Sequence, residues 1–446
     1  MSIADKLTLL INTKQDIKSA ISEKGVEVTG GMTTYADAIR RIETGGGGGD
    51  SIYVPIGLKF TYKSTSTSYN APNFTLPKLI LADGYTDGSY MFDGNESLTS
   101  INGIYTSTPS LTTCYSMFNK CESLESVPYF DISNVTDMYR MFTFCRSLIN
   151  IPLLNTSNVL NMDQAFDGCE SLTSIPQMDT SRVKSMSGTF LGCSSLTTIP
   201  LLNTSNVVDM SLLFSSCKLL TDVPQLDTSK VNNMDRMFAG CSSLTTIPLL
   251  NTSNVTITSY MFYYCESLTN IPQLDLSKVT DVSWMFYGCK SLTAIPQLNT
   301  SNVTNFYNCF NSCKSLTTIP QLNTSNVTNF EQCFKVCHSL QSLPLLDFSN
   351  VTRANYMFDD ASQSNIAPPY PDLTDLGGFK NLKVNLNLNG MPNLTVQSLM
   401  NVINNLYDFV GNGESTTRTL QLGTTNLNKL TAEQKAVATN KGWILK

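Results

Sequence analysis

The side chains best suited to chemistry in this sequence are thirteen cysteines and one histidine. Cysteine and histidine supply nucleophiles, general bases and zinc ligands. His338 directly follows Cys337, so a cysteine–histidine nucleophile has to be considered. Most of the cysteines recur at intervals of 24 residues: Cys121, Cys145, Cys169, Cys193, Cys217, Cys241, Cys265, Cys289, Cys313 and Cys337. Zinc sites need closely spaced pairs of ligands, which this interval does not supply, so we expect no metal and no cofactor.

The regular interval predicts that the cysteines are buried packing residues. Equivalent positions of stacked repeats lie above one another, so cysteines in phase form a ladder. The cysteine position is flanked by Phe and Leu and is Ala361 in the last copy, which suits a free thiol acting as a small apolar group. Occasional disulfides between neighbouring repeats are the alternative. Because Cys337 belongs to this ladder and His338 is Glu, Arg or Ser in other copies, we expect no enzymatic activity.

A second periodic position alternates between aspartate and asparagine. Its members are Asp131, Asn155, Asp179, Asn203, Asp227, Asn251, Asp275, Asn299, Asn323 and Asp347. A row of carboxylates could bind calcium, but Asn replaces Asp freely, which favours a repeated turn hydrogen bond. Charged residues make up 14% of the chain, the net charge is −6, and no basic cluster occurs. This composition argues against a nucleic-acid surface, which needs clustered Lys and Arg.

Twelve copies of one repeat must position these side chains. Phe keeps one position from Phe118 to Phe358 at the same 24-residue interval, and a further copy around Phe92 lies 26 residues upstream. Within one copy, Ser243 to Leu250 predicts a short strand closed by proline, and Asn251 to Val255 predicts a turn. The apolar spacing that follows such a turn predicts a helix, as in Val279, Val282, Met285, Phe286 and Cys289. The predicted fold class is therefore an α/β repeat of strand, turn and helix.

The repeat Cys-x-Ser-Leu-Thr-x-Ile-Pro-x-Leu-Asn-Thr-Ser-Asn-Val-Thr-x-Met-x-x-Met-Phe resembles the BspA-type leucine-rich-repeat family of bacterial surface proteins and mycoplasma lipoproteins. This resemblance implies a right-handed leucine-rich-repeat solenoid with a parallel β ladder and a role in adhesion. The chain departs from the family in lacking a lipoprotein signal. Residues 10–26 resemble short helical modules of phage virion proteins. The tail from about Leu394 resembles end modules of repeat proteins in phages of gut Bacteroides.

Composition and periodicity divide the chain into five segments. They are a helical anchoring module at 1–44, a glycine linker at 45–50, an N-terminal cap of short strands at 51–88, the leucine-rich-repeat solenoid at 89–362 and an α/β C-terminal cap at 363–446. The strands expected in the N-terminal cap lie at 52–54, 58–62 and 79–81. The elements expected in the C-terminal cap are strands near 384–388, 419–422 and 443–445, a helix over 394–409, and a helix from a capping box at Thr431 to about Asn440.

Six aromatic residues gather at variable positions of neighbouring repeats. They are Tyr260, Tyr263, Tyr264, Trp284, Tyr287 and Tyr307. Tyr260 and Trp284 share one position of the repeat, and Tyr263 and Tyr287 share another. Because neighbouring repeats lie roughly 5 to 10 Å apart, we expect one aromatic patch that stacks on sugars or anchors a protein interface. Ordinary packing between adjacent helices is the alternative.

These features predict a non-enzymatic phage virion protein of the tail-fibre or head-fibre type. Residues 1–44 would dock on a capsid or tail protein, and the solenoid would attach to a host surface protein or glycan. The start of the chain lacks the pattern of a secretory signal, and no long apolar stretch occurs, so we expect synthesis in the host cytoplasm, localisation to the virion and no membrane insertion. A homo-oligomer or several copies on a symmetric particle are expected. A bacterial cell-surface adhesin is the alternative, and a cytoplasmic scaffold is a third possibility.

Overall fold

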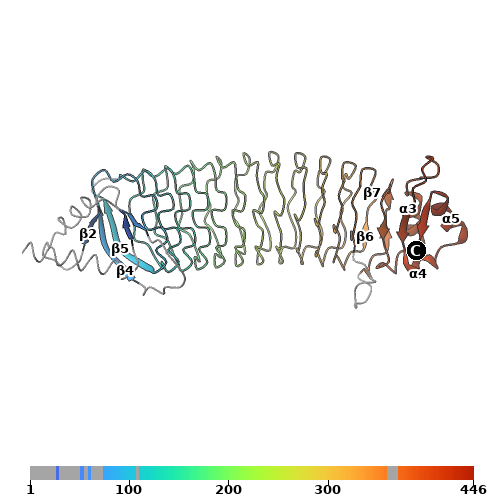
Figure 1. Cartoon of the computed structure of the whole chain (residues 1–446), viewed down its shortest axis with the longest axis horizontal. Coiled ribbons are helices and arrows are strands. Elements are labelled where there is room, and N and C mark those ends of the chain that lie inside the picture. Colours follow the sequence, from blue (N-terminus) through green and yellow to red (C-terminus); the bar gives the residue numbers. More distant parts are fainter. Residues whose placement is uncertain (1–26, 30–50, 55–58, 62–73, 107–109, 359–369) are drawn as a thin grey trace, which may run out of the picture. The chain divides into compact units, whose positions relative to one another are not determined.

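The computed structural model describes residues 27–29, 51–54, 59–61, 74–106, 110–358 and 370–446 (Figure 1). The chain divides into two compact units, Met1–Val207 and Val208–Lys446, which are described separately below. The predicted glycine linker lies outside the described residues. So does the predicted helical module at 1–44, except for one short strand, β1.

The first unit begins with two small groups of strands. Strand β1 (Glu27–Thr29) pairs antiparallel with β3 (Lys59–Thr61). Strands β2 (Ser51–Val54), β4 (Phe74–Leu81) and β5 (Leu98–Thr106) form a parallel sheet in the order β2-β4-β5. Strands β2, β3 and β4 confirm the short strands that the sequence predicted before the repeats.

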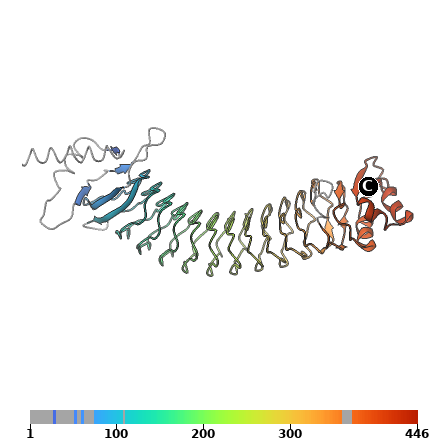
Figure 2. The same cartoon turned by 90° about the horizontal axis from the view of Figure 1, so that it is seen from below.

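After β5 the first unit continues as stacked turns of one repeat each, and the second unit begins with turns of the same kind (Figure 2). We call each turn a rung. Neighbouring rungs are joined by single parallel β bridges, such as Thr113 with Asp137 in the first unit and Asn305 with Asn329 in the second. The predicted parallel pairing is therefore present, but it lies after the turn. The leucine-rich segment Ser243 to Leu250 was predicted to be a strand but does not form one.

The helix predicted in each repeat is wrong. In the described rungs, the residues with helical apolar spacing form a succession of β-turns. The amide of Met285 donates to Val282 O at 3.2 Å, and that of Cys289 donates to Phe286 O at 3.1 Å, so both bonds span three residues. Apolar residues three or four positions apart still point inward, because each turn reverses the chain after that distance. A helix and a succession of β-turns therefore require the same spacing of apolar residues.

Bonds between rungs decide between these two structures. The amides of Trp284, Phe286 and Gly288 donate to carbonyl oxygens of the next rung at 3.0, 2.9 and 2.8 Å. An α-helix would consume these donors internally. The turns also require left-handed backbone at two places per rung, as at Trp284 (φ 61°) and Gly288 (φ 74°). Left-handed backbone costs most residues other than glycine about 1–2 kcal/mol, so the contacts between stacked rungs must offset this cost.

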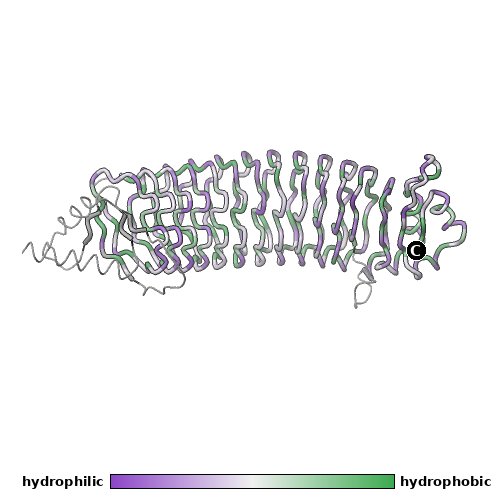
Figure 3. The backbone as a smooth tube through the Cα atoms, in the orientation of Figure 1, coloured by the Kyte–Doolittle hydropathy of each residue, from purple (hydrophilic) through white to green (hydrophobic). Residues whose placement is uncertain are grey.

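Phenylalanine and cysteine form the centre of each unit. In the first unit the rings of Phe118, Phe142 and Phe166 stack with centroids 5.2 and 5.5 Å apart. In the second unit the same column runs from Phe214 to Phe358 with neighbouring centroids 5.5 to 5.8 Å apart. All thirteen cysteines are buried free thiols, as predicted. Hydrophobic and hydrophilic residues alternate along the rungs because only every few residues point inward (Figure 3).

The second unit ends in longer elements. Two short parallel pairs come first, β6 (Ser342–Leu343) with β8 (Asp375–Leu376) and β7 (Leu346–Asp347) with β9 (Phe379–Lys380). The remaining elements are β10 (Leu386–Asn387), α3 (Val396–Asn404), β11 (Arg418–Gln421), α4 (Gly423–Leu427), α5 (Ala432–Asn440) and β12 (Trp443–Leu445), with a parallel sheet ordered β10-β11-β12. From β10 onward these elements confirm the predicted order of strands and helices, with α4 as an addition, whereas β8 and β9 were not predicted. The predicted capping box at Thr431 and Gln434 is present.

Candidate binding surface

The six aromatic residues singled out in the sequence lie together in the second unit, and we call them the aromatic cluster. Tyr260 and Trp284 stack with ring centroids 5.6 Å apart and an angle of 8° between the rings. Tyr263 and Tyr287 stack in the same way at 5.2 Å. Edge-on contacts join the rest: Tyr263 with Tyr264 at 4.6 Å, Tyr264 with Tyr287 at 5.3 Å and Trp284 with Tyr307 at 5.5 Å. The structure therefore brings all six rings into one contiguous group.

The local backbone explains why these rings meet. Tyr260, Tyr264 and Trp284 occupy left-handed turn positions with φ of 58°, 54° and 61°. Their rungs are held in register by backbone bonds, including Tyr264 N to Tyr287 O at 2.7 Å and Trp284 N to Tyr307 O at 3.0 Å. Equivalent side chains therefore project side by side at the spacing of the rungs. All six are half-buried, so the rings pack on one another and also remain partly open to solvent.

One arginine–aspartate pair lies beside the aromatic cluster. The Arg236 guanidinium lies 4.3 Å from the centroid of the Tyr260 ring, within the range of a cation–π contact. The same guanidinium pairs with the Asp235 carboxylate. Burial raises the pKa of Tyr263 and of Tyr287 above the ordinary value. Both phenols therefore stay neutral at physiological pH, and the cluster presents apolar ring faces with hydroxyl groups.

A second group of rings was missed in the sequence analysis. In the first unit Tyr115 lies 5.1 Å from Tyr90 and 4.9 Å from Tyr139, measured between ring centroids. The Arg140 guanidinium lies 5.0 Å from the Tyr139 ring. A signal was available, since Tyr115 and Tyr139 stand 24 residues apart in the same position of the repeat.

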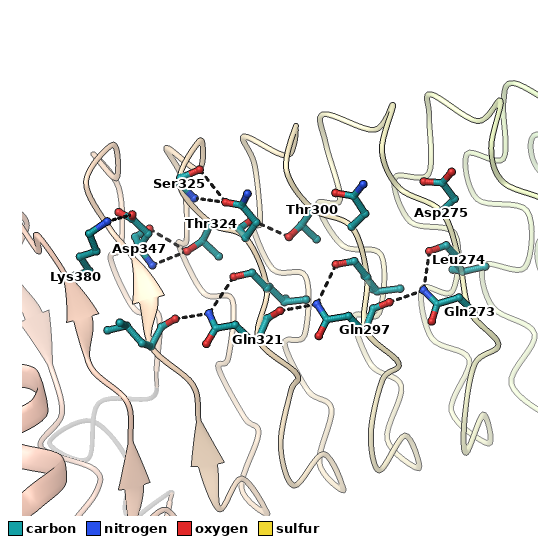
Figure 4. Close-up of a pocket in the computed structure, with 15 residues that line it drawn as sticks. Gln273, Leu274, Asp275, Gln297, Thr300, Gln321, Thr324, Ser325, Asp347 and Lys380 are labelled. Atoms are coloured by element: carbon teal, nitrogen blue, oxygen red, sulfur yellow. Dashed lines mark hydrogen bonds and ion pairs between the residues drawn. The ribbon is translucent and has the colours of Figure 1, made fainter.

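A groove in the second unit was also missed, and we call it the amide groove (Figure 4). Its volume is about 700 Å³. A row of glutamines, Gln273, Gln297 and Gln321, lines it together with a second row that includes Asp275, Asn299 and Asn323. At one end the Lys380 ammonium lies 2.9 Å from the Asp347 carboxylate. Only the 24-residue recurrence of glutamine after Ile-Pro could have indicated this row from the sequence.

Side chains take over the joining of rungs at the amide groove. Among the described residues, no backbone hydrogen bond links the Ile-Pro-Gln-Leu segments of Gln273, Gln297 and Gln321. Instead Gln321 Nε2 donates to Leu345 O at 2.7 Å, and Gln297 Nε2 donates to Gln321 O at 2.5 Å. A threonine three residues after the glutamine also joins the rungs, since Thr300 Oγ1 donates to Asn323 O at 2.7 Å.

The periodic Asp/Asn position forms the turn hydrogen bond that the sequence predicted. Asp275 Oδ1 accepts from Ser277 N at 2.9 Å, and Asn323 Oδ1 accepts from Ser325 N at 3.1 Å. In the described part of the chain, no group of three or more His, Cys, Asp or Glu side chains is arranged to hold a metal ion.

Cys337 lies in the core, and the neighbouring His338 is half-buried. The Cys337 thiol is buried and donates to Phe310 O at 2.9 Å. The His338 ring stands edge-on to Tyr370, with ring centroids 6.0 Å apart. Neither group lines the amide groove. Across the described residues, no helix is long and apolar enough to cross a membrane.

Solved structures of leucine-rich-repeat proteins show a distant similarity. A protein from Bacteroides ovatus is 18% identical, with a TM-score of 0.39 and coverage of 74% of this chain and 89% of that chain. One from Eubacterium ventriosum is 15% identical, with a TM-score of 0.34 and coverage of 68% and 90%. The repeat architecture of this chain follows from its own periodic contacts, not from these similarities. No curated protein matches the sequence significantly.

One family model matches the repeats directly. It carries the description "Mycoplasma protein of unknown function, DUF285" and matches residues 85–175, 112–200, 162–270, 193–293 and 267–368. The overlapping matches run without a gap from residue 85 to residue 368, which is more than half of the chain. They agree with the resemblance to mycoplasma proteins drawn from the repeat sequence. The chain therefore belongs to the DUF285 family of repeat proteins.

Proposed function

We propose that this protein is a non-enzymatic adhesion protein whose aromatic cluster contacts a host surface protein or glycan. One observation carries the proposal. Six aromatic rings from three consecutive rungs pack ring to ring, yet every one of them keeps part of its surface open. Accessible aromatic clusters concentrate binding energy, because they bury large areas at a small entropic cost.

The chemistry of the aromatic cluster defines what it would hold. Flat ring faces such as those of Trp284 and Tyr260 stack on the apolar faces of sugars or of other aromatic side chains. The hydroxyl groups of Tyr263 and Tyr287 stay protonated, because burial raises the pKa of both phenols, and the Tyr287 hydroxyl is already hydrogen-bonded to Tyr264 and Ser312. Arg236, which is paired with Asp235, places its guanidinium at the edge of the cluster.

A binding assay with one substitution tests the adhesive role. Trp284→Ala removes the ring that contacts four other members of the cluster. We expect binding of the purified chain to host cells to weaken about tenfold or more, while the melting temperature changes little. Tyr356→Ala is the matched control, because Tyr356 holds the same left-handed turn position (φ 54°) and is 61% exposed. Equal binding by the parent and Trp284→Ala would refute the proposal.

We propose that the protein is a component of a phage virion, with residues 1–44 docked on a capsid or tail protein. The resemblance of residues 10–26 and of the tail from about Leu394 to phage virion modules supports this proposal. A bacterial cell-surface adhesin is the second candidate, and membership in a family described from mycoplasma favours it. Several copies per particle would strengthen weak individual contacts through avidity.

Mass spectrometry separates these two candidates. Purified phage particles and washed outer membranes from the same culture would be compared. A fixed ratio of this chain to the major capsid protein supports the virion and gives the copy number. Detection on cells alone overturns the virion and leaves the adhesive role to a bacterial surface protein.

A further inference from the structure

The amide groove is independent of the aromatic cluster. It lies within the second unit and is lined by consecutive rungs that carry Gln273, Gln297 and Gln321. No member of the aromatic cluster lines it. A ligand of the groove would therefore add to whatever the cluster binds.

One side of the groove is a row of hydrogen-bond acceptors. The amide nitrogens of Gln297 and Gln321 are engaged twice, with the next rung and with the carbonyl of the following leucine at 3.5 and 3.3 Å. These bonds fix the orientation of each amide group. The three glutamines are exposed, and their Oε1 atoms accept no hydrogen bond from the described residues.

The other row supplies donors. The Oδ1 atoms of Asn299 and Asn323 accept the turn hydrogen bonds from the amides of Ser301 and Ser325. Their Nδ2 groups are left without a hydrogen bond to any described residue, and both side chains are exposed. A ligand lying in the groove would meet fixed acceptors on one edge and fixed donors on the other (Figure 4). Covering these groups with an apolar chain would leave them unsatisfied, which costs about 1–3 kcal/mol for each group.

The charge of the groove argues against an ionic polymer. Its charged residues are Asp275, Asp347 and Lys380, and the last two form an ion pair. No cluster of Lys or Arg is present to hold phosphates, sulfates or uronates. A ligand rich in neutral hydroxyl groups, which both donate and accept, fits both rows.

The repetition of the rungs favours a ligand that offers both kinds of group in every unit. In the core of these rungs the rings of Phe262, Phe286, Phe310 and Phe334 stand 5.5 to 5.7 Å apart. Successive residues of an extended peptide point to opposite sides, so a peptide presents the same side only every second residue. A six-membered sugar ring carries hydroxyl groups on both edges, so each unit can meet both rows of the groove.

We propose that the amide groove binds a neutral linear polysaccharide along the stacking direction, with successive sugar units opposite successive rungs. Hydroxyl groups on one edge of the chain donate to the glutamine Oε1 atoms, and those on the other edge accept from the asparagine Nδ2 groups. The rungs of Gln297 and Gln321 each add one equivalent pair of contacts, whereas the rung of Gln273 adds the glutamine acceptor without an asparagine donor, because Asp275 stands there.

Calorimetric titration of the full chain tests this site. The probes are cellohexaose, xylohexaose, mannohexaose and maltohexaose, with polygalacturonate as the acidic counterpart and a glycine–serine repeat peptide as the extended counterpart. The decisive variant is Gln297→Ala, at the centre of the groove. Gln225→Ala is the matched control, because Gln225 makes the same bond to the next rung, with Nε2 2.6 Å from Leu249 O, but lies outside the groove.

We expect at least one neutral hexasaccharide to bind, Gln297→Ala to weaken that binding about tenfold, and Gln225→Ala to bind as the parent does. Melting curves of the two variants should agree with each other. The proposal fails if no neutral probe binds, if polygalacturonate or the peptide binds instead, or if both glutamine variants lose binding equally. Loss of saccharide binding in Trp284→Ala but not in Gln297→Ala would place the sugar on the aromatic cluster, which overturns the groove and leaves the proposed adhesion intact.

Discussion

Cys289 Sγ donates a hydrogen bond to the carbonyl oxygen of Phe262 in the preceding rung, at 3.1 Å. The same carbonyl also accepts the amide of Cys265 at 3.0 Å. One small side chain thus fills an apolar position and satisfies a backbone oxygen of its neighbour. This relationship repeats at other rungs, for example from Cys145 to Phe118. Cysteine suits the position because it combines an apolar surface with a weak donor.

The thiols should therefore be unreactive until the protein unfolds. Burial raises the pKa of Cys241 to about 12 and raises the pKa of Cys265 and Cys289 as well. Only thiolates react quickly with disulfide reagents. We expect almost no thiol to react in the native protein at pH 8 and all thirteen to react in guanidinium chloride. Rapid titration of several thiols without denaturant would contradict the buried ladder.

Truncating one ring of the phenylalanine column should destabilise the protein strongly. Phe238 is completely buried and stacks on Phe214 and Phe262, with ring centroids 5.8 Å away in each case. Phe238→Ala should cost about 3–5 kcal/mol, from lost burial and the cavity left behind. Denaturant unfolding monitored by circular dichroism measures the cost. Tyr356→Ala, at an exposed position, is the control, and equal unfolding curves for parent and Phe238→Ala would disprove the core assignment.

Asp167 should make the protein less stable as the pH rises from about 4 to about 6. Burial raises the pKa of this carboxyl from 3.8 to about 6, against a smaller opposing effect of Arg140. The folded state therefore holds the proton more tightly than the unfolded state. The stabilisation from this proton is complete below pH 3.8 and is lost as the pH passes through 6.

Asp167→Asn should remove this loss. With solvent screening we expect the variant to be more stable than the parent by about 1–2 kcal/mol at pH 7, with the difference disappearing near pH 4. Urea unfolding at both pH values measures it. The control is Asp179→Asn, because neighbouring rungs already have asparagine there and the Asp179 pKa is lowered by bonds from Ser181. A parent as stable as Asp167→Asn at pH 7 would rule out the buried charge.

Lys120→Gly should stabilise the first unit. Lys120 is exposed and has a φ of 58°, at a position that is glycine in other rungs, such as Gly168. Relief of the left-handed strain, less the greater entropy of unfolded glycine, should raise the free energy of unfolding by about 0.5–1 kcal/mol. The reverse change, Gly168→Ala, should destabilise, because its Cβ would lie 2.5 Å from Phe144 Cδ1. Thermal unfolding of both variants measures the two signs, and a lower melting temperature for Lys120→Gly would contradict the turn geometry.

The sequence alone determined the repeat, the burial of the cysteines and, apart from α4, the order of elements after residue 380. These features are local or strictly periodic. Cys289 must lie in an equivalent place to Cys265, whatever backbone carries them, and Thr431 with Gln434 builds a capping box from four consecutive residues. The grouping of Tyr260 with Trp284 likewise followed from the 24-residue interval.

Tertiary structure decided what the repeat is made of. The spacing of Val282, Met285 and Cys289 fits a helix and a chain of turns equally well, and stacking favoured turns because the amides of Trp284 and Phe286 find their acceptors in the next rung. The amide groove also depends on the chain forming stacked turns and not helices. Where no backbone hydrogen bond joins the rungs, the side chains of Gln297 and Gln321 join them instead. These hydrogen bonds link residues 24 positions apart, so only the stacking of the rungs could determine them.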